Sequence, residues 1–395
     1  MDETVMLGHG SGGTMMKRII DEVFFEAYAG DELLQGNDAA VLPLAGGSGG
    51  FVLDDGASEA QSTGAGASEA QSTDVQLSLD VASDVNAIDA QSMCSVGCNA
   101  PRLAFSTDSF VVSPHFFPGG DIGRLAVCGT VNDVATSGAI PLYLSVGVIL
   151  EEGFPMRDVR KIAESMADAT REAGVKIVTG DTKVVNKGHG DGIFINTSGI
   201  GVLPAGVNLG GTNICSGDKV LVSGTLGDHG ITVMSCRENL SFQAHVKSDA
   251  APLNHLIANV LDAAPNTRAF RDPTRGGLAS TLNEFAEQAG VDIMIEEDAI
   301  PVKDAVRGAC EMLGYDVLQV ANEGKMVCVV PPDEAHVALS AMRASKYGED
   351  AAIIGEVCDV APANSERGPK VLLRTPFGST RILDMLVGQQ LPRIC

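Results

Sequence analysis

The sequence has few basic residues and no long apolar run. Its 395 residues include 27 Lys and Arg against 51 Asp and Glu, a formal net charge of −24 at pH 7. Such an acidic surface repels phosphate backbones and anionic lipids, so we expect no nucleic-acid or membrane partner. No apolar run reaches the ~20 residues that span a bilayer, and the start MDETVMLGHGSGG lacks the basic and apolar stretches of a signal peptide. We therefore expect a cytoplasmic protein.

The sequence also lacks the standard nucleotide and zinc motifs. It contains no GxxxxGK[ST] and no GxGxxG after an expected strand, so neither usual nucleotide-binding fold fits. The nine cysteines are odd in number, widely spaced and mostly within apolar runs, which is typical of reduced core thiols. Cys94 and Cys98 have no second ligand pair nearby, so they indicate a zinc site only weakly. Cys395 differs because it is the last residue, where we expect a thiol to have no packing role.

The composition is that of a globular protein, with 45% hydrophobic and 20% charged residues, and the length suits two domains. One segment departs from it. Residues 46–99 contain GASEAQST twice, at 56–63 and 66–73, and carry too little apolar surface to order themselves. We predict a disordered low-complexity insertion there.

Strand-like and helix-like periodicity alternate on both sides of residues 206–213, which have the composition of a linker. We predict two α+β or α/β domains of similar build, over residues 1–205 and 212–385, and a mobile tail over 386–395. The expected strands are 103–112, 142–150, 176–180, 193–203, 219–223, 291–295, 325–330, 352–357 and 370–374. The expected helices are 121–138, 158–173, 254–264, 278–288 and 334–344.

Three carboxylates in the first half occupy awkward positions. Asp38 enters an apolar run, Asp108 interrupts an expected strand, and Asp133 lies on an expected helix face of small residues. Each alone is most simply a cap or a surface side chain. Together they suggest Mg²⁺, because burying unpaired carboxylates is costly and Mg²⁺ takes oxygen ligands that it shares with nucleotide phosphates.

Glycine supplies a second signal, because its backbone approaches phosphate closely. Five motifs combine glycine with a charged or histidine residue: HGSGG (9–13), FPGGD (117–121), TGDTK (179–183), LGDHG (226–230) and DPTRGGL (272–278). We expect these motifs to be loops. Any one of these loops is weak evidence for phosphate binding, but five in one chain favour it.

Taken with NDAAV, TDSFVV, AVCGTVNDVA, GDGIFIN, VRGACEMLG, ANEGK and the terminal LPRIC, these motifs resemble the HypE family of hydrogenase maturation factors. That family belongs to the PurM-like superfamily of aminoimidazole ribonucleotide (AIR) synthetase and selenophosphate synthetase. The resemblance covers the chain apart from about residues 46–100, and ANEGK with a terminal PRIC is its most specific part. It implies a two-domain PurM-like fold whose N-terminal domain binds ATP and forms a homodimer through an inter-subunit β-barrel.

The resemblance also implies a reaction that uses ATP and Mg²⁺. A carbamoyltransferase, HypF, places a carbamoyl group on the C-terminal thiol, and ATP-driven dehydration converts it to a thiocyanate on the same sulfur. A HypC–HypD complex receives the cyanide for the iron of [NiFe]-hydrogenase. Phosphorylating the amide oxygen makes it a good leaving group.

Roles follow from the same resemblance. Asp38, Asp108, Asp133 and Asp272 match the Mg²⁺–ATP carboxylates, and Gly12, Gly13, Asp181 and Asp228 are weaker candidates for nucleotide contact. The expected catalytic residues are Cys395, which carries the group, Lys183, which stabilises the transferring phosphoryl group or the activated amide, and Glu323, the general base. Glu323 paired with Lys325 on the surface is the structural alternative. His9 and His229 could touch phosphate or carboxamide, or make structural hydrogen bonds.

Three other functions compete with this interpretation. The first is another superfamily enzyme, such as a selenophosphate synthetase or a small-molecule kinase, although HGSGG lacks the cysteine expected near the N-terminus of the former. The second is a non-catalytic nucleotide-binding scaffold, which would not hydrolyse ATP in step with thiol loading. A cysteine hydrolase fits least, because no motif suggests a Cys–His pair.

Overall fold

The computed structural model describes residues 4–6, 19–28, 102–238, 246–360, 368–385 and 393–395. The insertion predicted at 46–99 and the candidates His9, Gly12, Gly13 and Asp38 lie outside these residues. A π-helical turn, Ile20–Phe25, runs into α2 (Glu26–Tyr28). The described strands form a four-stranded sheet, a seven-stranded sheet and a two-stranded hairpin.

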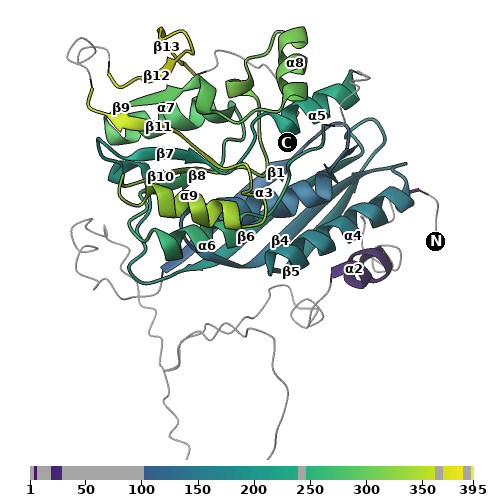
Figure 1. Ribbon diagram of the computed structural model, residues 1–395. Coiled ribbons are helices and arrows are strands. Elements are labelled where there is room, and N and C mark those ends of the chain that lie inside the picture. Colours follow the sequence, from purple (N-terminus) through teal and green to yellow (C-terminus); the bar gives the residue numbers. More distant parts are fainter. Residues whose placement is uncertain (1–3, 7–18, 29–101, 239–245, 361–367, 386–392) are drawn as a thin grey trace, which may run out of the picture. The chain divides into compact units, whose positions relative to one another are not determined.

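The four-stranded sheet has the order β1-β6-β4-β5. Strand β5 pairs parallel with β4, and the other pairs are antiparallel. Helices α3 and α4 cover one face of it (Figure 1). The bounds are Arg102–Phe110 (β1), Ile140–Glu151 (β4), Lys176–Val185 (β5), Ile193–Leu203 (β6), Ile122–Thr136 (α3) and Met156–Ala173 (α4).

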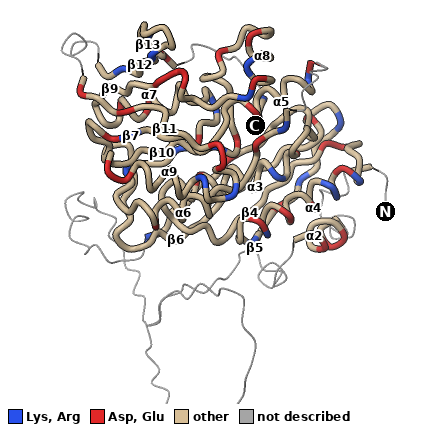
Figure 2. The backbone as a smooth tube through the Cα atoms, in the orientation of Figure 1, with Lys and Arg blue, Asp and Glu red and all other residues tan. Residues whose placement is uncertain are grey.

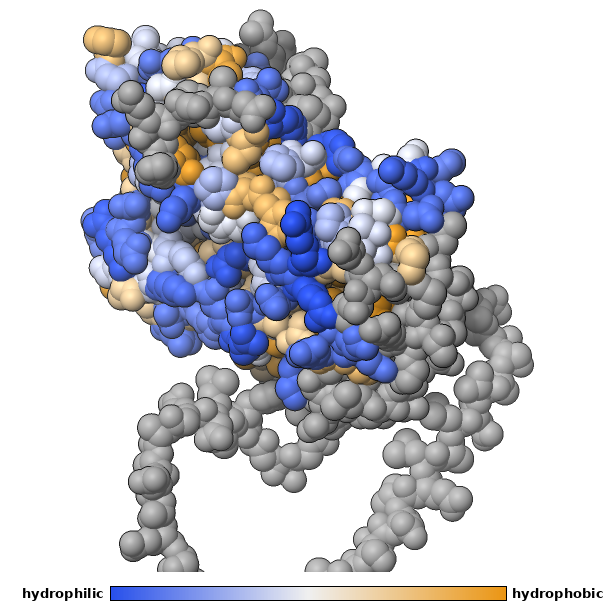
Figure 3. Space-filling view, turned by 90° about the vertical axis from the view of Figure 1, so that its right-hand side faces the viewer, coloured by the Kyte–Doolittle hydropathy of each residue, from blue (hydrophilic) through white to orange (hydrophobic). Residues whose placement is uncertain are grey.

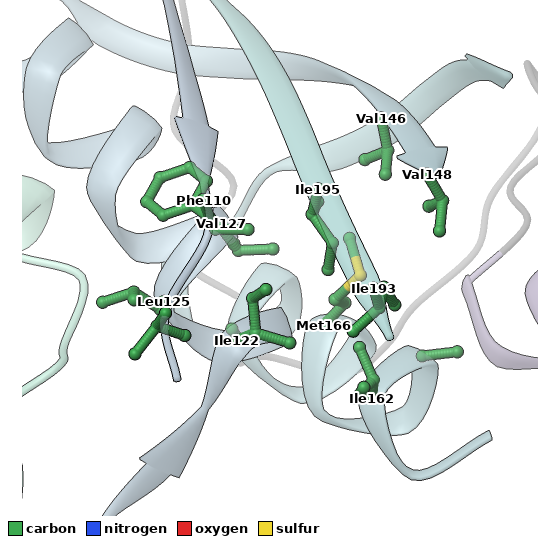
Figure 4. Close-up of a cluster of buried hydrophobic side chains, with 14 of the residues drawn as sticks. Phe110, Ile122, Leu125, Val127, Val146, Val148, Ile162, Met166, Ile193 and Ile195 are labelled. Carbon is green, nitrogen blue, oxygen red and sulfur yellow. The ribbon is translucent and has the colours of Figure 1, made fainter. Parts of the chain in front are cut away.

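Local signals explain where these two helices begin and end. Helix α3 starts where the Asp121 carboxylate accepts hydrogen bonds from the backbone N–H groups of Gly123 and Arg124, at 2.8 and 3.0 Å. Helix α4 ends at Gly174, whose φ of 72° is left-handed. Figure 4 shows their buried faces meeting the sheet, and each such side chain contributes about 1.5–3 kcal/mol of transfer free energy. The labelled residues are Phe110, Ile122, Leu125, Val127, Val146, Val148, Ile162, Met166, Ile193 and Ile195.

The opposite face of this sheet carries exposed apolar side chains. On β1, Leu103 and Phe105 are 59% and 69% exposed, whereas Phe110, on the other face, is buried. Phe105 lies directly opposite the exposed Ile200 of β6, and Ile149 of β4 is exposed as well. Because side chains alternate along a strand, these residues share the face that points away from α3 and α4.

The seven-stranded sheet has the order β13-β12-β9-β11-β7-β10-β8, with β12 parallel to β9 and the other pairs antiparallel. Val220 and Val222 of β7 pack with the α7 residue Leu282, while Leu221 between them packs with α6 and α9. Helices therefore cover both faces. The bounds are Lys219–Val222 (β7), Ala269–Arg271 (β8), Asp292–Glu296 (β9), Val327–Val330 (β10), Ala352–Cys358 (β11), Val371–Arg374 (β12), Thr380–Ile382 (β13), Asn254–Ala263 (α6), Gly277–Ala289 (α7) and Ala335–Ala344 (α9).

Most expected elements are present within a few residues of their predicted ends. Periodicity did not predict helices α5 (Asp228–Arg237) and α8 (Asp304–Leu313), which pack together. A short hairpin joins β2 (Phe116–Phe117) and β3 (Gly120–Asp121). Within the described ranges, no helix combines the length and apolar character needed to cross a membrane. Among the residues that are coloured by hydropathy in Figure 3, most are hydrophilic, and they surround a smaller hydrophobic area.

Candidate active site

Three of the predicted metal carboxylates come from separate elements and act on one another. Asp108 is on the α3-facing side of β1, Asp133 is on α3, and Asp272 directly follows β8. Ser106 Oγ, on the same side of β1 as Asp108, donates a hydrogen bond to Asp133 Oδ2 at 2.9 Å. The charge of Asp108 bears on the ionisation of both other carboxyl groups. The structure therefore brings the described members of the predicted set together.

Burial dominates the ionisation of this group. It raises the pKa of Asp133, the Ser106 hydrogen bond opposes the rise, and the charge of Asp108 adds to it. Burial also raises the pKa of Asp272 to about 7, with the charge of Asp133 as the next cause. Arg275 and Arg271 supply the opposing positive charge at Asp133. Repulsion between enclosed carboxylates is what a bound cation removes.

Glu323, in the ANEGK motif, joins the same group. It is 3% exposed, and its Oε1 has no hydrogen-bond partner in the described part of the chain. Burial raises the pKa of Glu323 well above its usual range, and the charges of Asp272 and Asp249 raise it further. Lys325 Nζ lies 3.6 Å from Asp249 Oδ2, so Lys325 pairs with Asp249. The structural alternative of a surface Glu323–Lys325 pair is therefore wrong.

The loop that carries Glu323 is fixed by its neighbours on both sides. Asn322 is fully buried, accepts from the Gly227 N–H at 2.7 Å, and donates to the Pro273 carbonyl at 3.0 Å. The Glu323 N–H donates to Asp249 Oδ1 at 3.1 Å. A Cβ at Gly324 would lie 1.7 Å from the Asp249 carbonyl oxygen, so only glycine fits there. These contacts tie the GDHG, DPTRGG and ANEGK motifs into one framework.

The end of the chain lies in this site. Arg393–Cys395 runs antiparallel to the continuation of β1: the Val111 N–H donates to the Cys395 carbonyl oxygen at 3.2 Å, and the Ser113 N–H to that of Arg393 at 3.3 Å. In Figure 1 the C-terminus lies beside α5 and above α3, and Figure 2 shows acidic and basic positions around it. Burial raises the pKa of the Cys395 thiol, the charge of Glu323 adds to the rise, and Arg275 opposes it.

This arrangement corrects one expectation. We expected a terminal thiol to have no packing role, but Cys395 packs against the first-domain core and Ile394 is 3% exposed. The reason is that backbone hydrogen bonds, which no side-chain pattern reveals, attach the tail to the end of β1. Residues 386–392 lie outside the described residues.

Three other candidates do not join the group within this chain. Asp181 and Lys183 form an exposed ion pair at 2.7 Å on β5, the far edge of the sheet from β1. Asp228, at the start of α5, is 1% exposed; it pairs with Lys303 at 2.7 Å and accepts from the Thr225 hydroxyl at 2.6 Å.

The expectation that TGDTK is a loop is wrong, because the whole motif lies within β5. Its Gly180 marks a close approach of strands: a Cβ there would lie 2.6 Å from the Val146 carbonyl oxygen. The pairing of β4 with β5 shifts register nearby, between Leu144 and Ser145. Glycine within a strand is typical of such an irregularity.

The sequence interpretation missed several residues of the site. Arg275 is within the quoted DPTRGGL motif, and Ser106 is two residues before Asp108 in the expected strand 103–112, so their polarity beside the named carboxylates was the available signal. No sequence signal pointed to Asp249, because its hydrogen bond with Glu323 joins residues 74 positions apart in the sequence. Asn132 links α3 to the segment before α6 by accepting from the Leu253 N–H at 2.7 Å.

The donor set fits Mg²⁺ that arrives with a nucleotide. Oxygen ligands suit this ion, and the unpartnered Glu323 Oε1 and the mutually repelling carboxylates call for a positive charge. Within the described ranges, no three His, Cys, Asp or Glu residues form a group that could hold a metal by themselves. Mg²⁺ commonly takes one or two carboxylates and completes its shell with phosphate oxygens and water.

Comparison with known proteins defines first the class of protein. The family described as AIR synthase related protein, N-terminal domain, matches residues 93–203, and its C-terminal domain counterpart matches residues 216–363. The chain is a two-domain AIR synthase related protein, which confirms the predicted PurM-like α+β fold.

Full-length relatives then define the particular family. Over 392 residues the chain is 46% identical to the carbamoyl dehydratase HypE of Azotobacter vinelandii, covering 99% of this chain and 97% of that protein. The chain belongs to the HypE family of carbamoyl dehydratases. A crystal structure of the maturation protein HypE in complex with ATP aligns with a TM-score of 0.81 and 41% identity, covering 99% of this chain and 100% of that one. A chain from a HypE–HypF complex aligns with a TM-score of 0.69 and 54% identity, covering 72% of this chain and 90% of that one.

Proposed function

We propose that this chain dehydrates an S-carbamoyl group on its own Cys395 to a thiocyanate, at the expense of ATP, and so supplies cyanide for the iron of [NiFe]-hydrogenase. The observation that carries the proposal is the placement of the terminal thiol in a group of buried carboxylates that includes Glu323, with its unpartnered Oε1. ATP binding is supported by the similar HypE structure that contains ATP.

The proposed dehydration has two steps, transfer of a phosphoryl group and loss of phosphate. The amide oxygen of Cys395–S–C(=O)NH₂ forms a bond to the γ-phosphorus of ATP, and ADP leaves with the electron pair of the broken P–O bond. The C–O bond then breaks, phosphate leaves, and loss of both amide protons gives S–C≡N. We assign one of those protons to Glu323, because a carboxylate with a raised pKa is a stronger base than one in water.

Asp108, Asp133 and Asp272 would hold Mg²⁺ together with Asp38, which lies outside the described residues. Bound Mg²⁺–ATP supplies the phosphoryl group and offsets the negative charge of the phosphates. The fixed backbone of the ANEGK loop keeps Glu323 at the terminal thiol.

We also propose the partners that this reaction requires. A HypF carbamoyltransferase would load the thiol, in line with the HypE–HypF complex known for a similar chain. A HypC–HypD complex would receive the cyanide. Both need Cys395 to leave its docked position, since loading and delivery occur outside this chain.

The first test replaces Glu323 with Gln. We expect the Glu323→Gln variant to accept the carbamoyl group but to dehydrate it at least about 100-fold more slowly, the usual contribution of a positioned general base. Rapid-quench mass spectrometry of the preloaded chain with Mg²⁺–ATP measures this step. Dehydration at the wild-type rate would exclude Glu323 as the base.

A stability measurement shows that this variant is folded. The pKa of Glu323 is raised from 4.5 on folding, so its contribution to stability is fully present below the unfolded pKa and is lost as pH rises through the folded one. Gln has no such dependence. Without nucleotide, Glu323→Gln should therefore gain stability over wild type as pH rises above 4.5, by up to about 1.4 kcal/mol per pH unit. Denaturant unfolding at several pH values measures it.

We propose further that a second copy covers the exposed apolar face of the four-stranded sheet, which includes Phe105 and Ile200. Large exposed apolar patches mark interfaces. Lys183 is on β5 of this sheet. For Lys183 to act at the phosphoryl group, the Lys183 side chain of one copy must therefore reach the site of the partner copy.

Mixing two inactive variants tests this arrangement. We expect Lys183→Ala and Cys395→Ala each to be inactive alone, and their mixture to recover about a quarter of the sites, as a random isologous dimer predicts. Native mass spectrometry of the mixture measures how much heterodimer has formed. A mixture that stays inactive although heterodimer has formed would place Lys183 in the site of its own chain, and a Lys183→Ala chain that is active alone would place Lys183 outside catalysis.

A further inference from the structure

Two side chains of α5 hold the docked tail through its backbone. Arg393, at φ 53°, has a left-handed conformation that residues with a side chain rarely adopt. Docking therefore works against the preferred backbone geometry of the tail. The two strand hydrogen bonds from Val111 and Ser113 are long, at 3.2 and 3.3 Å. Shorter contacts come from His229 and Arg237.

His229 is fully buried and its ring has a defined tautomer. Its Nε2 lies 2.9 Å from the Ile394 carbonyl oxygen, which can only accept, so Nε2 carries the proton and donates. Its Nδ1, 2.8 Å from Ser248 Oγ, then accepts the hydroxyl proton, while Ser248 Oγ accepts from the Ala250 N–H at 3.1 Å. Phe117 meets the ring edge-on at 5.4 Å. The imidazole is thus aimed at the tail, not at a phosphate.

Arg237 joins the tail to the strand beside it. Its Nη2 donates to the Arg393 carbonyl oxygen at 2.7 Å and to that of Ser113 at 2.6 Å, and its Nε donates to Ser113 at 3.0 Å. His229 and Arg237 thus grip the carbonyls of two consecutive tail residues. Both are on one helix, two turns apart.

We propose that His229 and Arg237 are positioning residues that set how much of the time Cys395 spends in its own site. This rests on the proposed function, in which the thiol must leave to be loaded and return to be dehydrated. We call these two residues the tail clamp. Because both of them bind main-chain carbonyls, the clamp recognises the backbone of the chain end and not its side chains.

The test compares His229→Ala, His229→Gln and Arg237→Ala with the control His255→Ala, which changes an exposed histidine of α6. Gln can place an N–H donor near the position of Nε2, so it should restore the clamp. The first readout is alkylation of the Cys395 thiol in the uncarbamoylated full-length chain, followed on the peptide that begins after Lys370. We expect about tenfold faster alkylation in His229→Ala and Arg237→Ala, the effect of losing one buried hydrogen bond to the tail, and wild-type rates in His229→Gln and His255→Ala.

The second readout separates clamping from folding. Carbamoyl loading by the transferase should be unchanged or faster in His229→Ala and Arg237→Ala, whereas dehydration of the preloaded chain should slow about tenfold. A variant that merely misfolds would lose both steps. Wild-type alkylation rates in both His229→Ala and Arg237→Ala would show that these residues do not hold the tail in the site. If wild type itself fails to dehydrate, the proposed function fails, and the alkylation rates still decide whether the clamp exists.

Discussion

Cys395→Ala is expected to abolish both carbamoylation and thiocyanate formation while leaving the fold intact. The side chain is partly buried against the core, but it is small, and the backbone atoms of residues 393–395 make the docking hydrogen bonds. We therefore expect less than about 1 kcal/mol of change in stability. Intact-protein mass spectrometry with the transferase and carbamoyl donor measures loading, and phosphate release measures turnover.

Cys310→Ala is the matched control for this result. Cys310 is a buried thiol on α8 and belongs to a different core cluster from Cys395. That variant should load one carbamoyl group and dehydrate it at the wild-type rate. Loading of the Cys395→Ala chain at any other cysteine would contradict the proposed mechanism.

Asp108→Asn and Asp133→Asn are expected to reduce Mg²⁺–ATP turnover below about 1% of wild type, because each removes a charged oxygen from the proposed metal site. Without ligand, neither change should destabilise the chain, since each removes a charge from a repelling group. Phosphate release from the preloaded chain measures the loss. Asp168→Asn, at an exposed position of α4, is the control. Wild-type turnover in both site variants would move the metal site elsewhere.

The same carboxylates predict how the Mg²⁺ requirement depends on pH. The pKa of Asp272 is about 7, so below that pH a cation must displace a proton to bind. The Mg²⁺ concentration that gives half-maximal turnover should therefore rise as the pH falls from 8 to 6. A constant requirement over this range would mean that Asp272 does not bind the metal.

Local patterns predicted the elements, and long-range contacts explain what they missed. The alternation in 142–150 and the helical spacing in 158–173 gave β4 and α4, because burial on one face imposes those periods. Helix α8 was predictable too, since Val306, Ala309 and Cys310 follow helical spacing. TGDTK misled because glycine serves strand irregularities as well as phosphate loops.

The site was only partly accessible to the same reasoning. Asp108, Asp133, Asp272 and Glu323 were named from motifs, and the fold brings them together. Asp249 could not be found, because its role depends on a contact with a distant loop. Tail docking uses backbone groups that every sequence has, so it leaves no sequence pattern to recognise.

In the proposed mechanism one sulfur atom, that of Cys395, carries the carbamoyl group and then the thiocyanate. The most direct measurement is intact-protein mass spectrometry of the wild-type chain, with peptide mapping of the segment after Lys370. The predicted result is a gain of one carbamoyl group from the transferase, followed by loss of one water when Mg²⁺–ATP is added, both on the terminal peptide. A modification on any other cysteine, or a carbamoyl group that persists while ATP is hydrolysed, would contradict the claim.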